Sequence, residues 1–213
     1  MRFPTVPIIA LLIASSSAPF AQVGTRPAKE WIPTLERPER VAGMKIPDVL
    51  GKLELKPGDV VADLGAGTGV FAWPIAKAVA PGTVYAVEVD QDFVTLMQSR
   101  VKETHVSNVR PMLGKFDDPL LPEKVDLAFF SDVLHHVANQ GSYLKTVAGY
   151  LKPGGRIAVI ELDATHPNSP HRNQPEQQVS KAQLDAWMTA AGLTKVSEPP
   201  LFEDKWFVIY RKR

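Results

Sequence analysis

The densest group of residues able to do chemistry is the segment DLGAGTG, from Asp63 to Gly69. An apolar run precedes it and apolar residues with helical spacing follow it, which indicates a turn between a strand and a helix. Glycines allow the backbone of such a turn to approach a ligand closely. A carboxylate at the end of the strand repels phosphate and favours a cation. The segment therefore predicts a ligand that is positively charged or zwitterionic near the glycines.

Two familiar phosphate-binding patterns do not fit this turn. The dinucleotide pattern G-x-G-x-x-G requires a third glycine where Val70 stands, and no Gly-Lys-Ser/Thr follows as in a phosphate loop. S-adenosylmethionine has a sulfonium, an ammonium and no phosphate, and so meets the requirement. An NAD-dependent dehydrogenase remains an alternative, disfavoured by Val70 and Asp63. The alternative without a ligand is that the glycines only make a tight turn between the strand and the helix.

The same segment resembles the first motif of the class I S-adenosylmethionine-dependent methyltransferases. Four later segments resemble the motifs of that family in the same order, and the resemblance covers roughly residues 41–213. It implies that Glu88, nineteen residues beyond Gly69, accepts both ribose hydroxyls of the donor, although Glu88 could also be a solvated strand end. The four later segments are VYAVEVD, MLGKFDDPLLP, VDLAFFSDVLHHV and LKPGGRIAVIE.

The loop expected at the adenine departs from the family pattern. Members often have Gly-Asp-Ala where this chain has Gly114-Lys115-Phe116, so we carry the adenine contact over to Asp117, with Phe116 packing beside it. Acids before a proline are also ordinary loop residues, which leaves a purely structural role open for Asp117. The donor contacts implied by the resemblance are Asp63, Gly65, Ala66, Gly67, Gly69, Glu88, Val89, Phe116, Asp117 and Ser131.

Histidines provide the candidates for proton transfer. His135 and His136 follow the fourth expected strand, at the sheet edge where ligands of such folds bind. Methyl transfer from a sulfonium requires a general base only if the acceptor must lose a proton, so both histidines could equally be packing or capping residues. His166 and His171 lie in a polar loop beside the same edge. The four histidines lack a recognisable metal-ligand spacing, and we expect no metal.

Short apolar runs alternate with helical patterns along the chain, which favours a parallel sheet covered on both faces. The last two runs are joined too closely for a helical crossover and should be antiparallel. We predict an α/β fold with a Rossmann-like, seven-stranded, mostly parallel sheet, a C-terminal antiparallel hairpin and helices on both faces. The expected strands are 60–64, 83–89, 109–113, 125–131, 156–161, 193–198 and 206–211, and the expected helices lie near 70–79, 93–102, 143–151 and 181–191.

The first residues resemble a secretory signal peptide. A single early cation, Arg2, precedes a short apolar run and then small residues up to Ala21. We expect cleavage after Ala21, a periplasmic or secreted protein with no stable membrane insertion after cleavage, and a cytoplasmic location as the alternative. Three regions follow: a signal peptide over 1–21, an N-terminal arm and lid over 22–47, and a methyltransferase domain over 48–213. The proline-rich arm is expected to be extended and to lead into a helix whose apolar positions include Val41, Met44, Val49, Leu50 and Leu53.

Composition and charge restrict the classes of partner and of binding site that we expect for this protein. The formal net charge is +1 and no basic stripe is present, so a nucleic-acid partner is not expected. The absence of cysteine excludes disulfides, zinc–thiolate sites and a cysteine nucleophile. Without an inserted domain to grip a macromolecule, the expected function is methyl transfer from S-adenosylmethionine to a small organic acceptor. The alternative from another class is an exported S-adenosylmethionine-binding protein without turnover.

Overall fold

The computed structural model describes residues 27–170 and 172–213. The predicted signal peptide over 1–21 and His171 lie outside the described residues. Within the described ranges, no helix combines the length and the apolar character needed to cross a bilayer.

The described chain is organised around one seven-stranded sheet with the strand order β3-β2-β1-β4-β5-β7-β6. Strands β1 to β5 are mutually parallel, and β7 is antiparallel to both of its neighbours. This arrangement confirms the predicted fold class, including the closing antiparallel hairpin. The bounds are β1 Val61–Leu64, β2 Val84–Glu88, β3 Val109–Leu113, β4 Val125–Ser131, β5 Leu151–Leu162, β6 Leu193–Ser197 and β7 Lys205–Lys212.

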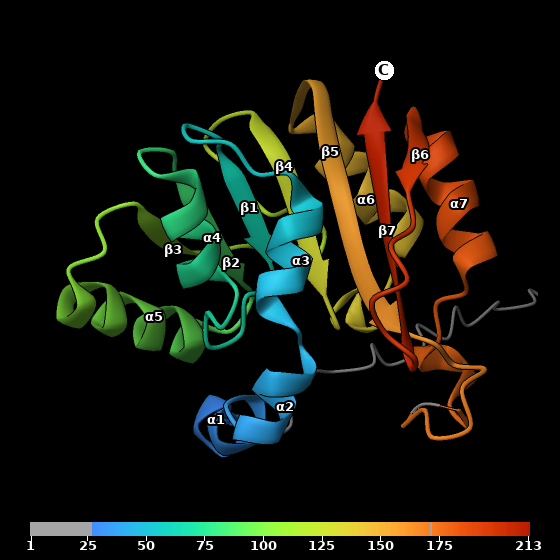
Figure 1. The fold of residues 1–213 in the computed structure, drawn as a ribbon, viewed down its shortest axis with the longest axis horizontal. Helices are drawn as coiled ribbons and strands as arrows, with labels where there is room; N and C mark the ends of the chain where they lie inside the picture. Colours follow the sequence, from blue (N-terminus) through green and yellow to red (C-terminus); the bar gives the residue numbers. More distant parts are fainter. Residues whose placement is uncertain (1–26, 171) are drawn as a thin grey trace, which may run out of the picture.

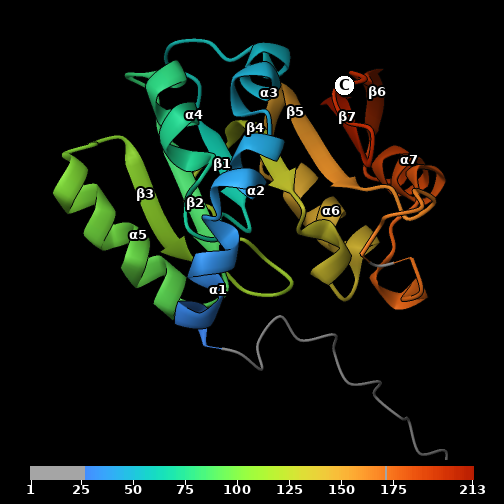
Figure 2. The same cartoon turned by 60° about the horizontal axis from the view of Figure 1, so that its bottom comes forward.

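Helices cover both faces of the sheet. In Figures 1 and 2, α3 and α4 lie on one face, whereas α6 lies on the other. Buried Met97 of α5 belongs to the same apolar cluster as α3 and α4, and buried Met188 of α7 belongs to the cluster of α6. The bounds are α3 Ile46–Leu53, α4 Ala72–Val79, α5 Gln91–Thr104, α6 Gln140–Gly149 and α7 Lys181–Ala190, with short 3₁₀ helices η1 Leu134–His136 and η2 Pro175–Gln177.

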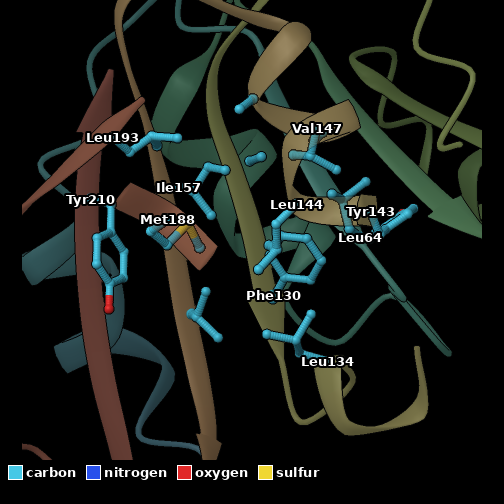
Figure 3. Packing of buried hydrophobic residues seen from close by; sticks show 14 of the residues in the cluster. Leu64, Phe130, Leu134, Tyr143, Leu144, Val147, Ile157, Met188, Leu193 and Tyr210 are labelled. Carbon is cyan, nitrogen blue, oxygen red and sulfur yellow. The ribbon is translucent and has the colours of Figure 1, made fainter. Parts of the chain in front are cut away.

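Alternation along the strands divides the core into these two clusters. Leu64 and Phe130 point toward α6, where they meet Leu144 (Figure 3), whereas Val61 and Phe129 join the cluster on the opposite face. Successive strand residues point to opposite faces, so a strand buried on both sides reads as a continuous apolar run. The carboxyl ends of the parallel strands are thereby fixed along one edge of the sheet.

The N-terminal arm is helical rather than extended. Helix α1 (Ala28–Leu35) lies in the segment that the sequence predicted to be extended, and α2 (Pro38–Gly43) contains Val41, the first apolar position of the predicted helix. Pro38 occupies the first position of α2 and Pro47 the second position of α3, where the N–H that proline lacks would have no intrahelical partner. In Figures 1 and 2, α1 and α2 lie beyond the carboxyl edge of the sheet.

Candidate functional site

A cavity of about 560 Å³ opens at the carboxyl edge of the sheet. It lies among the ends of β1, β2 and β4 and under the two N-terminal helices. Most of its wall is apolar or aromatic, and its charged side chains lie at a few separate points. The residues from the strand ends and the loops after them include Asp63, Gly65, Ala66, Gly67, Glu88, Val89, Asp90, Lys115, Phe116, Phe130, Ser131, Asp132, Val133 and His136.

The turn after β1 requires its glycines. Gly65, Gly67 and Gly69 have φ angles of +72°, +57° and +85°, a region that residues with a Cβ rarely adopt. A Cβ on Gly65 would lie 2.3 Å from Val133 Cγ2, and a Cβ on Gly69 would lie 2.0 Å from Trp73 Cζ3. The turn is therefore closely covered on two sides. Gly65 and Gly67 line the cavity, whereas Gly69 lies behind it against α4.

Asp63 is a buried acid at the base of this turn. Its side chain is only 3% exposed, and its Oδ2 atom has no hydrogen-bond partner among the described residues. Burial, and then the nearby charge of Glu88, raise the pKa of Asp63 to about 7. An unpartnered buried oxygen is costly, so Asp63 would be stabilised by a cationic or N–H-bearing ligand.

Glu88, at the end of β2, ties the glycine turn to the neighbouring strand. Gly67 N donates a 2.7 Å hydrogen bond to Glu88 Oε1, and Val89 N donates a 3.0 Å bond to Oε2. Burial raises the pKa of Glu88, and these two backbone hydrogen bonds oppose the rise. Glu88 is thus a half-buried carboxyl held beside the cavity wall rather than a solvated strand end.

The two histidines after β4 occupy different environments. His136 lines the cavity, whereas His135 is buried and its Nδ1 lies 2.6 Å from Glu161 Oε1. His135 N also donates to Glu161 Oε2 at 3.2 Å, and the two histidine rings lie 4.0 Å apart between centroids. Glu161, which the sequence analysis did not single out, fixes η1 and the cavity wall that η1 carries. Of the two predicted candidates, only His136 can touch a ligand in this arrangement.

The predicted adenine loop is less closely joined to the cavity. The side chain of Phe116 lines the rim although it is 67% exposed. Asp117 is exposed and does not line the cavity, and Asp118 instead accepts a 2.9 Å hydrogen bond from the Tyr150 hydroxyl. The adenine contact of Asp117 therefore stays a prediction.

The polar loop before α7 contributes little to the cavity wall. Of its described residues, Gln177 in η2 lines the cavity. Among the described residues, no three histidine, cysteine or acidic side chains form a group that could hold a metal ion.

Helices α1 and α2 supply the roof of the cavity through Trp31, Leu35, Arg40 and Met44. Their contact with the glycine turn is direct, because Leu35 Cδ1 lies 3.6 Å from the position of a Cβ on Gly67. The sequence predicted a lid over residues 22–47, and within that segment α1 lies against the glycine turn. Whether it opens is a separate prediction.

An ion pair fastens the roof to the rest of the fold. Glu36, directly after α1, pairs with Arg100 of α5, and the same Nη1 atom of Arg100 donates a 2.9 Å hydrogen bond to Thr68 O in the glycine turn. The hydrogen bond from Arg100 lowers the pKa of Glu36. One guanidinium thus joins α1, α5 and the ligand-facing turn.

Several cavity residues were not predicted from the sequence. Phe130 and Tyr143 line one wall from β4 and α6. Asp132 follows β4 with a φ of +54°, which is uncommon for a residue with a Cβ. An acid directly after a buried strand was the available signal for Asp132. The aromatic residues read as ordinary core positions.

A protein-family comparison matches residues 55–203 to a model described as a methyltransferase domain. One relative, a ubiquinone/menaquinone biosynthesis C-methyltransferase of Hydrogenovibrio crunogenus, is 31% identical over 51% of this chain and 44% of its own length. Another, a tRNA U34 carboxymethyltransferase of Desulfotalea psychrophila, is 25% identical over 84% of this chain and 56% of its own length. The chain therefore spans about half the length of these relatives.

Among solved structures, the fold is similar to an S-adenosylmethionine-dependent methyltransferase from Aquifex aeolicus. The TM-score is 0.78, with 21% identity over 88% of this chain and the whole of that chain. At this identity the comparison establishes the shared architecture.

Proposed function

This chain belongs to the methyltransferase domain family that matches residues 55–203, and from that premise we propose that it transfers a methyl group to a small organic acceptor. Its cofactor is S-adenosylmethionine, the methyl donor. The observation that carries the proposal is the buried, unpartnered Oδ2 of Asp63 under a turn of positive-φ glycines. The alternative of an NAD-dependent dehydrogenase is disfavoured because a pyrophosphate would meet that carboxylate.

The residues of the cavity fit this donor chemically. Asp63 presents a buried carboxyl oxygen, Oδ2, that has no hydrogen-bond partner among the described residues. A cationic or N–H-bearing group of a ligand could supply that partner. Glu88 holds the backbone of Gly67 in place and lines the cavity, and its contact with the ribose hydroxyls stays a prediction. The mostly apolar wall suits an uncharged ring system. When bound, the donor supplies an activated methyl group on a sulfonium.

The protein's own contribution is alignment and the exclusion of water. Helix α1 contributes Trp31 and Leu35 to the cavity roof, with Leu35 against the glycine turn, and apolar residues from β4 and α6 form the facing wall. Orienting two reactants in a closed, apolar site lowers the barrier without a chemical group from the protein. His136 is the described histidine at the wall that can accept a proton when the acceptor carries one.

A small-molecule acceptor is supported by the cavity volume of about 560 Å³, which the donor would partly fill. The relative named for ubiquinone/menaquinone biosynthesis acts on a small molecule by its name, whereas another relative is named for tRNA. A methyl-labelling screen of a native extract, separated into small-molecule, protein and nucleic-acid fractions, tests the proposal. Label confined to macromolecules would refute a small acceptor.

Donor binding is tested by calorimetry with S-adenosylmethionine, S-adenosylhomocysteine and NAD. We expect binding of the first two and not of NAD, and loss of that binding in Asp63→Asn and Gly67→Val. Valine at Gly67 would have to adopt a φ of +57° beside Leu35. Asp92→Asn is the matched control, because Asp92 is exposed and outside the cavity wall. Unchanged affinity in Gly67→Val would remove the site assignment.

Two further proposals rest on the sequence. Tight binding of S-adenosylhomocysteine without turnover across an acceptor panel would favour the alternative of a binding protein. Export to the periplasm or medium rests on the segment over 1–21, and N-terminal sequencing of secreted material should find a start near Gln22. An intact Met1 form confined to the cytosol would overturn export.

A further inference from the structure

Arg40 lies in the cavity wall with most of its hydrogen-bonding capacity unused. Its side chain, 26% exposed, extends from α2. Nη1 donates a 2.9 Å hydrogen bond to Leu35 O and contacts Met44 Sδ at 3.8 Å. Nε and Nη2 make no hydrogen bond within the described part of the chain, where the nearest acid is Asp132, its Oδ2 4.0 Å from Nη2. These two N–H groups share one edge of the guanidinium plane.

The charge of Arg40 is not balanced by that acid. Lys205 Nζ lies 2.5 Å from the same Oδ2 atom of Asp132, so the carboxylate is already paired. Lys205 and Asp132 are 16% and 14% exposed at their side chains, which limits screening by water. The three residues together carry a formal charge of +1, with Arg40 and Asp132 in the wall of the cavity and Lys205 behind Asp132. Burial lowers the pKa of Arg40, and the charge of Arg37 adds to this effect, yet a guanidinium stays protonated in proteins.

We propose that Arg40 binds the carboxylate of a molecule held in the cavity, through its Nε and Nη2 edge. A guanidinium edge and a carboxylate form two parallel hydrogen bonds. A phosphate group fits less well, because Asp63, Glu88 and Asp90 also line the cavity and would repel a second negative charge. The inference rests on the proposed function and identifies a recognition residue within it.

Two sources of the carboxylate are chemically equivalent at Arg40. The methyl donor has an amino-acid carboxylate of its own, beside the ammonium that Asp63 would attract. The acceptor could carry a carboxylate instead, with its remaining surface against the apolar wall. The experiment is designed with one arm for each source, using wild type, Arg40→Gln and the control Arg37→Gln. Arg37 is exposed and outside the cavity wall, and its substitution removes the same charge from α2's N-cap.

The first arm compares S-adenosylhomocysteine with 5′-methylthioadenosine, which lacks the amino-acid portion. If the donor supplies the carboxylate, Arg40→Gln weakens S-adenosylhomocysteine binding about tenfold to a hundredfold, as expected for a charged hydrogen bond. Binding of 5′-methylthioadenosine should stay within twofold in both variants. Circular dichroism and thermal melting of each variant establish that the fold is intact.

The second arm uses the complex with S-adenosylhomocysteine and compares 2-naphthoate with 2-naphthamide, two probes of equal shape. If the acceptor supplies the carboxylate, wild type prefers naphthoate about tenfold, Arg37→Gln retains the preference and Arg40→Gln loses it. No loss in either arm with Arg40→Gln, including the absence of any naphthoate binding to wild type, overturns the inference. If wild type binds neither nucleoside, the donor assignment fails instead, and the naphthoate arm on the ligand-free protein decides the role of Arg40.

Discussion

Two features distinguish the residues at the end of β1 and in the turn after it. The turn requires glycine, and the strand carries a buried acid. Gly65 has no room for a methyl group beside Val133, and Asp63 has no internal partner for one carboxyl oxygen. Neither arrangement favours folding, because positive φ angles and unpaired buried polar atoms both carry a cost. Such costs concentrate at functional sites. The motif could be predicted from sequence because each residue type has a local requirement.

The ionisation of Asp63 should make stability and ligand binding depend on pH in opposite directions. Its folded pKa of about 7 lies above the ordinary value of 3.8 for an aspartate, so between these two pH values the ligand-free folded state holds a proton that the unfolded state has lost. The free energy of unfolding should therefore fall as pH rises from about 4 to 7, by up to roughly 1.4 kcal/mol per pH unit for this one group. Urea unfolding at several pH values measures it.

Over the same range, binding of S-adenosylhomocysteine should strengthen as pH rises, because its ammonium prefers the ionised carboxylate. Asp63→Asn should reduce the slope of stability and bind weakly at every pH. Burial also raises the pKa of Glu88. Glu88 therefore adds to the dependence of stability on pH, and the Asp63→Asn variant retains this contribution. An Asp63→Asn protein with the full wild-type slope would show that Asp63 does not titrate in this way.

Gly65→Ala should be severely destabilising. The new Cβ would lie 2.3 Å from Val133 Cγ2 on a backbone with a φ of +72°, so overpacking and conformational strain add to about 2–4 kcal/mol. Thermal and urea unfolding measure the loss. Gly51→Ala is the control, since Gly51 is an exposed position in α3 with open space around it, and it should be neutral or stabilising by about 0.5–1 kcal/mol. Equal effects at both glycines would contradict this account.

At the scale of elements, the sheet was predictable, whereas the N-terminal helices were predicted only in part. The strands over 109–113 and 125–131 agree with the structure at both ends, because each is a short, mainly apolar run with polar residues or glycine beyond its ends. Strand β5 begins earlier than predicted, at Leu151, which pairs with Val125 across a register shift. Helix α1 was missed because prolines were taken as evidence of extended chain, and the single helix predicted through Val41 and Leu53 is divided at the left-handed Lys45 into α2 and α3. The burial of α1 and α2 against the cavity depends on contacts that are distant in sequence.

The ion pair between Glu36 and Arg100 should hold α1 over the glycine turn. Arg100→Ala removes the pair and the hydrogen bond to Thr68 O. Because both side chains are about one-third exposed, the cost in global stability should be small, at most about 1 kcal/mol. Amide hydrogen exchange should nevertheless become faster in α1 than in α6. Lys102→Ala, a nearby charge removal on α5, is the control, and unchanged exchange in α1 would show that the pair does not fasten this helix.

At the scale of the whole molecule, the cavity exists because the topology brings distant segments to one edge. The ends of β1, β2 and β4 meet there because parallel strands share a direction, and α1 and α2, which precede the strands in the chain, lie beyond these ends (Figure 1). The sequence predicted the strand ends that supply Asp63, Glu88 and Ser131. It placed Arg40 within the predicted lid over 22–47 but did not predict the contacts of its side chain, because the position of a short helix over a sheet depends on tertiary packing. The local motifs are therefore predictable from the sequence, whereas the contacts between distant segments around the cavity are not.

The two apolar clusters pack on the faces of the sheet whose edge carries the cavity. A substitution within a cluster should lower the stability of the fold without changing ligand affinity. Leu144 of α6 is fully buried against the sheet, where it meets Phe130 (Figure 3), and it does not line the cavity. Leu144→Ala should cost about 2–5 kcal/mol through lost burial and the cavity left behind, as measured by urea unfolding. The exposed Leu120 provides the control, since Leu120→Ala should change stability by less than about 0.5 kcal/mol.

At a temperature where Leu144→Ala remains folded, its affinity for S-adenosylhomocysteine should stay within about threefold of wild type, because the strand ends are held by the whole sheet. A large loss of affinity in folded Leu144→Ala would mean that α6 sets the geometry of the donor site directly.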